Sequence, residues 1–204
     1  LLLWKESNNR KPLIVFGARQ VGKTYLINNF CKNEFKNYFG VNLFERTDIV
    51  ELYESKQNAN EKYIQLLSLC NIQTVDENTI LFIDEIQESP TLISNLKYIS
   101  ESHPNLRIIC AGSLLGVMLK RTKNKKAFPV GKVDMITMYQ MDFEEYLMAF
   151  NEDALIDQIK IHYDNNTPML ESMHNKALNY YYSYLYTGGM PEAVKNITLC
   201  ERNI

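Results

Sequence analysis

Short runs of consecutive apolar residues alternate with stretches of helical periodicity through the first two thirds of the chain. The five runs span residues 13–17, 38–43, 79–83, 106–111 and 133–139. Between them, apolar residues recur every three or four positions, which is typical of helices that bury one face. Strands that alternate with helices predict an α/β fold, in which a five-stranded parallel sheet carries helices on both faces.

Polar signals indicate where several of these helices begin and end. The polar stretch 55–60 divides the helical region 45–72 into two helices. Ser89 is expected to cap a helix that runs to about residue 102, with Pro90 in its first turn. We also expect a helix at about 22–32 and another from Ser113 to about Arg121.

Strand patterns stop after Met141, and the remainder of the chain is predicted to be helical. Helices are expected at 143–150, at about 152–163 and at about 168–186, where tyrosine is frequent. Gly188 and Gly189 should end the last of them, because glycine readily leaves the helical conformation. This change of pattern indicates a domain boundary near residue 141.

Composition restricts the class of protein further. The chain has 204 residues, enough for one α/β domain and a smaller helical domain. Its net charge of −2 gives no overall attraction to nucleic acid or an acidic membrane. No apolar run approaches the roughly 18 residues that span a bilayer. Four widely separated cysteines in apolar segments favour core thiols in a reducing cytoplasm over disulfides or a zinc site.

The first apolar run leads directly into a glycine-containing loop and then into a helical pattern. Residues 17–24 read GARQVGKT and match GxxxxGK[ST] at every fixed position. Such a loop binds phosphate through backbone N–H groups and the start of the helix, and we expect its glycines to allow close approach of the phosphate. The predicted nucleotide-binding residues are Gly17, Ala18, Arg19, Gln20, Val21, Gly22, Lys23, Thr24 and Tyr25.

The loop predicts particular roles for two of these side chains. Lys23 should reach the β- and γ-phosphates, and the Thr24 hydroxyl should bind Mg²⁺. ATP and Mg²⁺ are therefore the expected ligands. The alternative is a glycine turn that merely joins a strand to a helix.

A second motif follows about 60 residues later, where the third apolar run ends in Asp84 and Glu85. Ligands of open α/β sheets bind beyond the carboxyl ends of the strands. We therefore expect Asp84 to hold Mg²⁺ near Thr24, and Glu85 to polarise the water that attacks the γ-phosphate. Taken alone, an acidic pair at the end of a strand is also typical of an ordinary polar turn.

A third segment, AGSLLG at 111–116, ends another predicted strand at Ser113. If this strand neighbours the one that carries Asp84, the Ser113 hydroxyl would contact the γ-phosphate or the attacking water. The alternative is that Ser113 caps the following helix. Both interpretations stay open.

In this order, the segments GARQVGKT, ILFIDEIQ, AGSLLG, FPVGKV and YTGGMPEAV resemble a bacterial and archaeal family of AAA+-related ATPases. Members of that family carry an N-terminal ATPase domain and a C-terminal domain of unknown function, sometimes described as nuclease-like. The resemblance covers essentially the whole chain. It implies that the strand before the phosphate loop is central and lies beside the strand before Ser113.

The resemblance also implies a division of the chain into a P-loop ATPase core at 1–141, a helical lid at 142–187 and the start of a truncated, winged-helix-like segment at 188–204. Relatives often carry Gly-Arg where this chain has Gly131-Lys132. Candidates for a cation that acts on a neighbouring subunit are Arg19, Arg121 and Lys132. The basic stretch 120–126 is interpreted either as a solvated loop or as a contact with nucleic acid.

Two functions compete. One is an ATPase that couples hydrolysis of Mg-ATP to movement of a C-terminal module or a partner, with Lys23, Glu85 and Ser113 as catalytic residues. The other is a nucleotide-dependent switch with negligible turnover, for which Glu85 would be unnecessary. Self-association and a DNA or protein partner are hypotheses for either function. A small-molecule kinase is disfavoured because no arginine-rich lid follows, and a GTPase because no Asn-Lys-x-Asp motif occurs.

Overall fold

The computed structural model describes residues 1–113 and 131–201. The chain forms two compact units, Leu1–Met138 and Tyr139–Ile204. The first unit contains a five-stranded sheet in the order β2-β3-β4-β1-β5, and its neighbouring strands all pair in parallel. The predicted α/β fold is thus confirmed, and β1 lies beside β4 as the family resemblance implied. The implied central position of β1 was wrong, because β4 is the middle strand. The strands are β1 (Leu13–Phe16), β2 (Asn37–Asn42), β3 (Thr79–Asp84), β4 (Arg107–Gly112) and β5 (Asp134–Thr137).

Alternate residues of the strands face two separate hydrophobic cores. Ile83 and Cys110 belong to one core, while Phe82 and Ile109 belong to the other. Successive strand residues point to opposite faces, so an apolar residue at every position means that both faces are covered. β3, an interior strand of the sheet, is accordingly buried at all of its positions.

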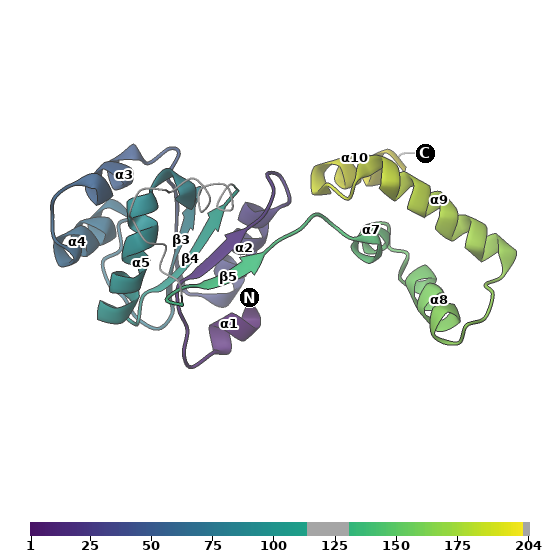
Figure 1. Cartoon of the computed structure of the whole chain (residues 1–204), viewed down its shortest axis with the longest axis horizontal. Helices are drawn as coiled ribbons and strands as arrows, with labels where there is room; N and C mark the ends of the chain where they lie inside the picture. The colour runs from purple at the N-terminus through teal and green to yellow at the C-terminus, as the bar shows by residue number, and fades with distance from the viewer. Residues whose placement is uncertain (114–130, 202–204) are drawn as a thin grey trace. The chain divides into compact units, whose positions relative to one another are not determined.

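Helices cover both faces of the sheet, as Figure 1 shows. The first core is completed by α3, α4 and α5, and the second by α1 and α2. The pattern of the sequence did not indicate α1, which is short and held by Trp4, whose ring nitrogen donates to the Lys11 carbonyl at 2.8 Å. The helices of this unit are α1 (Leu2–Glu6), α2 (Lys23–Glu34), α3 (Thr47–Glu54), α4 (Ala59–Leu69) and α5 (Pro90–Ser102), with a 3-10 turn η1 at Ile86–Glu88.

The predicted start of α5 is confirmed. Ser89 is fully buried, and its hydroxyl accepts a hydrogen bond from the backbone N–H of Leu92 at 3.2 Å. Pro90 occupies the first helical turn, where its missing N–H costs nothing. The helix expected from Ser113 to Arg121 lies outside the described residues beyond Ser113 itself.

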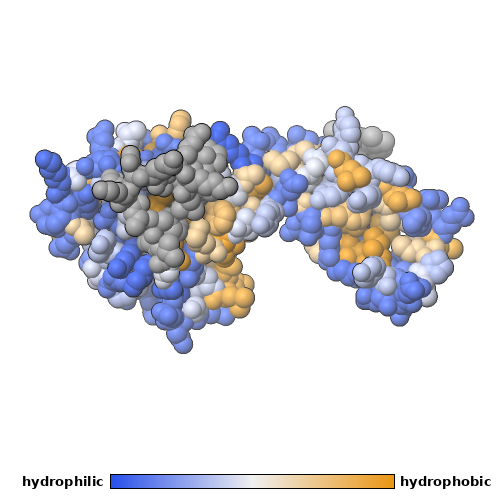
Figure 2. Space-filling view, viewed as in Figure 1, coloured by the Kyte–Doolittle hydropathy of each residue, from blue (hydrophilic) through white to orange (hydrophobic). Residues whose placement is uncertain are grey.

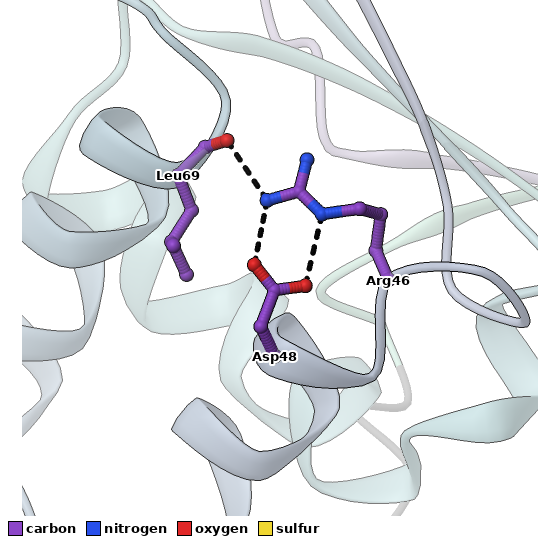
Figure 3. A network of polar contacts seen from close by, with 3 residues as sticks. All are labelled: Arg46, Asp48 and Leu69. Atoms are coloured by element: carbon purple, nitrogen blue, oxygen red, sulfur yellow. Dashed lines mark hydrogen bonds and ion pairs between the residues drawn. The ribbon is translucent and has the colours of Figure 1, made fainter.

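Two cations connect α3 to α4 at opposite ends. Arg46, which precedes α3, donates to both carboxylate oxygens of Asp48 at 2.9 and 2.7 Å and to the Leu69 carbonyl at 2.9 Å (Figure 3). The buried ammonium of Lys62 on α4 donates to the carbonyls of Tyr53 and Ser55, at 2.9 and 2.8 Å. Helix C-terminal carbonyls lack partners within their helix, so these bonds satisfy the ends of both helices. The pair is thereby fixed on its face of the sheet.

The second unit is helical in its described residues and has a small core of its own. Its helices are α7 (Phe143–Ala149), α8 (Asp153–Asp164), α9 (Glu171–Thr187) and α10 (Pro191–Glu201). Leu147, Leu155 and Ile156 form the buried cluster. Asp142 and Glu145 cap the start of α7 reciprocally. Gly188 ends α9 in the left-handed conformation at φ +70°, which confirms the predicted break.

The tyrosines of α9 divide into packed and exposed groups. Tyr184 packs against Phe143 and Tyr146, with ring centroids 5.6 and 5.5 Å apart, while Tyr182 and Tyr186 are exposed. The packed tyrosines therefore stabilise contacts within this unit. Apolar surface is also visible on this unit in Figure 2.

In the part of the chain that the structure describes, no helix has both the length and the apolar character needed to cross a bilayer.

Candidate nucleotide-binding site

The three segments singled out in the sequence end at one edge of the sheet. Phe16 is in register with Gly112, and Ile83 is in register with Cys110. Because all of these strands are parallel, the residues that follow them emerge at the same carboxyl edge. The loop after β1, the acidic pair at the end of β3 and Ser113 after β4 are thus brought to one place in the fold.

The loop after β1 depends on two left-handed backbone positions. Gln20 has φ +64° and Gly22 has φ +93°, and α2 begins directly afterwards at Lys23. No side chain caps the N-terminus of α2, and no acidic residue lies in its first turn. This terminus combines unblocked N–H groups with the positive end of the helix dipole, and it suits a bound anion.

Gly17 is required by the packing of the sheet, a reason that the motif did not indicate. A Cβ atom at this position would lie 2.0 Å from the backbone oxygen of Met138, which follows β5. The Met138 N–H in turn donates to the Phe16 carbonyl at 2.7 Å. The glycine therefore permits close packing of two neighbouring strand ends, and the expected close approach of a phosphate to this residue stays a prediction.

Lys23 is only 8% exposed, and its ammonium group bends back over the loop. Its Nζ donates to the carbonyls of Gly17 at 3.1 Å and Ala18 at 2.6 Å. Burial lowers the pKa of Lys23, while the nearby carboxylates of Glu85 and Asp84 act in the opposite direction. A cation held in this way inside the loop can contact phosphate oxygens that the loop binds.

Thr24 and Asp84 form the direct contact between the two motifs. The Thr24 hydroxyl donates to Oδ2 of Asp84 at 2.8 Å, and Oδ1 of Asp84 accepts from the Glu85 backbone N–H at 2.9 Å. Burial raises the pKa of Asp84, and the hydrogen bond from Thr24 opposes that shift. A hydroxyl and a carboxylate at this distance are the hard oxygen donors that Mg²⁺ prefers, so these residues fit the expected metal.

Glu85 lies immediately beyond β3 and has an unusual backbone. Its φ and ψ are +52° and +44°, in the left-handed region that glutamate rarely adopts. One of its carboxylate oxygens accepts a hydrogen bond from the Gln87 side-chain amide. Gln87 was not predicted to belong to the site, although its position two residues beyond Glu85 in the DEIQ segment was the available signal.

Ser113 follows β4 at the same edge of the sheet. Its Oγ atom is shielded from solvent, yet it forms no hydrogen bond with any residue in the described ranges. A shielded hydroxyl without a partner calls for an explanation, and a ligand or water at the site would supply one. This observation fits the predicted contact with the γ-phosphate or its water.

The other predicted loop residues differ widely in exposure. Val21 is buried, and it anchors the loop to the core. Ala18, Arg19 and Gln20 are exposed on the loop. Tyr25 follows Thr24 and is 80% exposed, so its side chain is accessible to solvent.

Lys132, one of the cations proposed to act on a neighbouring subunit, lies within the described residues. Its Nζ lies 3.0 Å from a carboxylate oxygen of Glu101, in the last turn of α5. Lys132 precedes β5, and Asp134 is in register with Leu13 at the amino end of β1. Lys132 is therefore at the edge of the sheet opposite the phosphate loop of its own chain. Arg121 and the basic stretch 120–126 lie outside the described residues.

Three cysteines are free and buried, as the sequence predicted for core thiols. Burial raises the pKa of Cys31 to about 12 and that of Cys70 to about 11. Cys110 is buried in the same way, whereas the side chain of Cys200 lies outside the described part. Within 1–113 and 131–201, no group of three or more His, Cys, Asp or Glu residues is placed to hold a metal ion.

A parallel α/β sheet of this strand order, with a phosphate loop after β1 and an acidic strand end on β3, defines the class of P-loop nucleoside triphosphatases. Within that class, a family model described as an AAA domain matches residues 9–147. The chain belongs to this family of AAA domains.

Two solved structures are similar in fold. A Walker-type ATPase of Pyrococcus abyssi gives a TM-score of 0.52 at 17% identity, over 93% of this chain and 63% of that chain. A structure of Drosophila ORC bound to DNA gives a TM-score of 0.56 at 16% identity, over 98% of this chain and 56% of that chain. The chain thus spans less than two thirds of each of them. No match was found among curated proteins.

Proposed function

We propose that this chain binds Mg-ATP at the phosphate loop and hydrolyses it to ADP and phosphate. The observation that carries the proposal is the 2.8 Å hydrogen bond between Thr24 and Asp84, which joins the two motifs at one sheet edge. Membership in the AAA domain family and the ATPase among the similar structures support it.

Phosphate binding would rest on the loop and the start of α2. Backbone N–H groups after Gly17 and the uncapped N-terminus of α2 would hold the phosphate oxygens. Lys23 would leave the carbonyls of Gly17 and Ala18 and donate to the β- and γ-phosphates instead. Thr24 and Asp84 would hold Mg²⁺, which supplies neutralisation of the charge on the phosphate oxygens.

Hydrolysis requires a group that orients water for attack on the γ-phosphorus. The Glu85 carboxylate would accept a proton of this water while its oxygen forms the new bond to phosphorus. The bond from the γ-phosphorus to the bridging oxygen of the β-phosphate would break at the same time, which leaves ADP. The Ser113 hydroxyl would donate to the γ-phosphate or hold the water, and it would thereby gain the partner it lacks among the described residues.

Hydrolysis is proposed to change the conformation of a C-terminal module or a partner. In this scheme 1–141 is the ATPase core, 142–187 is a lid and 188–204 begins a further segment. The ORC structure among the similar folds is bound to DNA, which makes DNA a partner to test alongside proteins and further copies of this chain.

The direct test is to compare the native chain with Glu85→Gln in ATP binding and ATP turnover. The proposal predicts that both bind ATP and that only the native chain hydrolyses it. Tight binding by the native chain without turnover would favour a nucleotide-dependent switch.

A further inference from the structure

The backbone of Glu85 is held in a conformation that its own side chain disfavours. Its φ of +52° belongs to the region that glycine and asparagine enter most readily. Such a conformation persists only where neighbouring structure enforces it, and residues of this kind concentrate at functional sites. The cause must therefore be sought in the residues that follow.

Two buried residues fix the chain directly after Glu85. Ile86 is fully buried in the core that α3, α4 and α5 complete, and Ser89 is fully buried at the start of α5. The Glu85 carbonyl accepts from the Glu88 N–H at 3.0 Å, and the Ile86 carbonyl accepts from the Ser89 N–H at 3.2 Å. These contacts force a tight turn immediately beyond β3, and the left-handed residue begins that turn.

Gln87 lies within this turn, and its side chain returns to Glu85. The Gln87 amide nitrogen donates to Oε2 of Glu85. An ionised carboxylate has no hydrogen to donate and only accepts hydrogen bonds. The NH₂ end of the amide must therefore face it. The other end, Oε1 of Gln87, is shielded from solvent and forms no hydrogen bond with a described residue. Within the described structure, the orientation of this amide is thus set by Glu85.

We propose that Gln87 is the positioning residue for Glu85. Its amide fixes the carboxylate in the direction required to receive the proton of the attacking water. This inference rests on the proposed hydrolysis of ATP, and it goes further by naming a residue that acts through Glu85. Gln87 would not bind ATP, so its loss should slow the chemical step and spare affinity.

The variants separate this role from simple packing. Gln87→Met keeps the length and bulk of the side chain but removes the amide, and Gln87→Glu replaces the donor by a second negative charge. Gln65→Met makes the same chemical change at an exposed position on α4 and serves as the matched control. ATP affinity, KM and kcat are measured for the native 204-residue chain and for each variant of it.

The expected result is a selective loss of kcat. Gln87→Met should lower kcat by about tenfold to a hundredfold, because a misplaced catalytic group can cost that much. Its KM and ATP affinity should stay within about twofold of the native values, as should every parameter of Gln65→Met. Gln87→Glu should lose more kcat than Gln87→Met, since the two carboxylates repel each other. Native kcat in Gln87→Met would overturn the proposal, and so would a parallel loss of kcat and ATP affinity.

A double-mutant cycle on unfolding measures the contact without any turnover. Glu85→Ala, Gln87→Met and the double variant are unfolded without nucleotide, and the effects on stability are compared. Non-additive effects support the positioning contact, and additive effects overturn it. If the native chain shows no hydrolysis, the proposed function fails, and this cycle still decides whether Gln87 holds Glu85.

Discussion

Thr24 and Asp84 are hydrogen-bonded at 2.8 Å although 60 residues separate them in the chain. Thr24 is the last residue of the phosphate-loop motif, and Asp84 ends a strand that is not adjacent to β1, since β4 lies between β1 and β3. The contact therefore depends on α2, β3 and the sheet order together. It brings a hydroxyl and a carboxylate to one point where a divalent cation has suitable ligands.

Removal of the Thr24 hydroxyl should uncouple ATP binding from Mg²⁺. Thr24→Val preserves side-chain shape and deletes the donor to Asp84, so we expect the gain in ATP affinity on adding Mg²⁺ to be largely lost. Thr74→Val, at an exposed position outside the site, should retain that gain. Isothermal titration with and without Mg²⁺ is the measurement, and an unchanged Mg²⁺ effect in Thr24→Val would contradict the proposed metal site.

Loss of the Lys23 ammonium should weaken ATP binding itself. Hydrogen bonds to charged groups contribute about 1.5–3 kcal/mol, so Lys23→Ala should reduce affinity by at least about tenfold. Lys32→Ala removes an exposed ammonium from the last turn of the same helix and should leave affinity unchanged. Equal ATP affinities of Lys23→Ala and the native chain would contradict the proposed binding of ATP at the phosphate loop.

Asp84 should reduce the stability of the nucleotide-free protein near neutral pH. Burial raises its pKa in the folded state, so the folded protein holds this proton more tightly than the unfolded chain does. The resulting stabilisation is present at low pH and is lost as the pH rises through the folded pKa. Asp84→Asn imitates the protonated form and should raise the melting temperature near pH 7, by an amount that shrinks towards about pH 4.

The control for that comparison is the effect of Mg-ATP. The native chain should gain stability when Mg-ATP is added, because a ligand that binds only the folded state stabilises it, whereas Asp84→Asn should gain much less. A variant that is less stable than the native chain at every pH would show that the hydrogen bonds of Asp84 outweigh the cost of its buried charge.

Gly188 and Gly189 offer a matched pair in the second unit. Both have positive φ, at +70° and +66°, but a Cβ at Gly188 would meet nothing within 4 Å, whereas one at Gly189 would lie 2.2 Å from the Met141 backbone oxygen. Gly188→Ala should cost about 1–2 kcal/mol, the usual penalty for a side chain in the left-handed region. Gly189→Ala should cost clearly more, because backbone must move. Chemical denaturation of both variants tests this, and equal losses would contradict the described packing.

Much of the fold was predictable because local patterns and tertiary structure agree. The uninterrupted apolar run that became β3 reflects burial on both faces, and Ser89 with Pro90 marks the start of α5 in a way that depends on few long-range contacts. The position of α1 was not predictable, since five residues are too few to show a helical pattern and the helix is held by the burial of one of them, Trp4.

The candidate site was likewise predictable only in part. The residue types in the phosphate loop and at the end of β3 indicated that these two motifs would lie close together, because parallel strands end at one edge of the sheet. The packing requirement at Gly17 could not be read from the motif, since it comes from the close approach of Met138, more than 100 residues further along the chain. The left-handed conformation of Glu85 was hidden as well, because it follows from the burial of Ile86 and Ser89 on either side of Gln87.

We propose that the carboxylate of Glu85 enables this chain to hydrolyse ATP. The most direct measurement is ATP turnover per molecule as the protein concentration rises, for the native chain and for Glu85→Gln. We predict measurable turnover in the native chain, rising with concentration if a neighbouring copy completes the site, and its loss in Glu85→Gln with ATP binding retained. Equal turnover in the two proteins would contradict the role of Glu85, and ATP binding by the native chain without turnover at any concentration would contradict hydrolysis at this site.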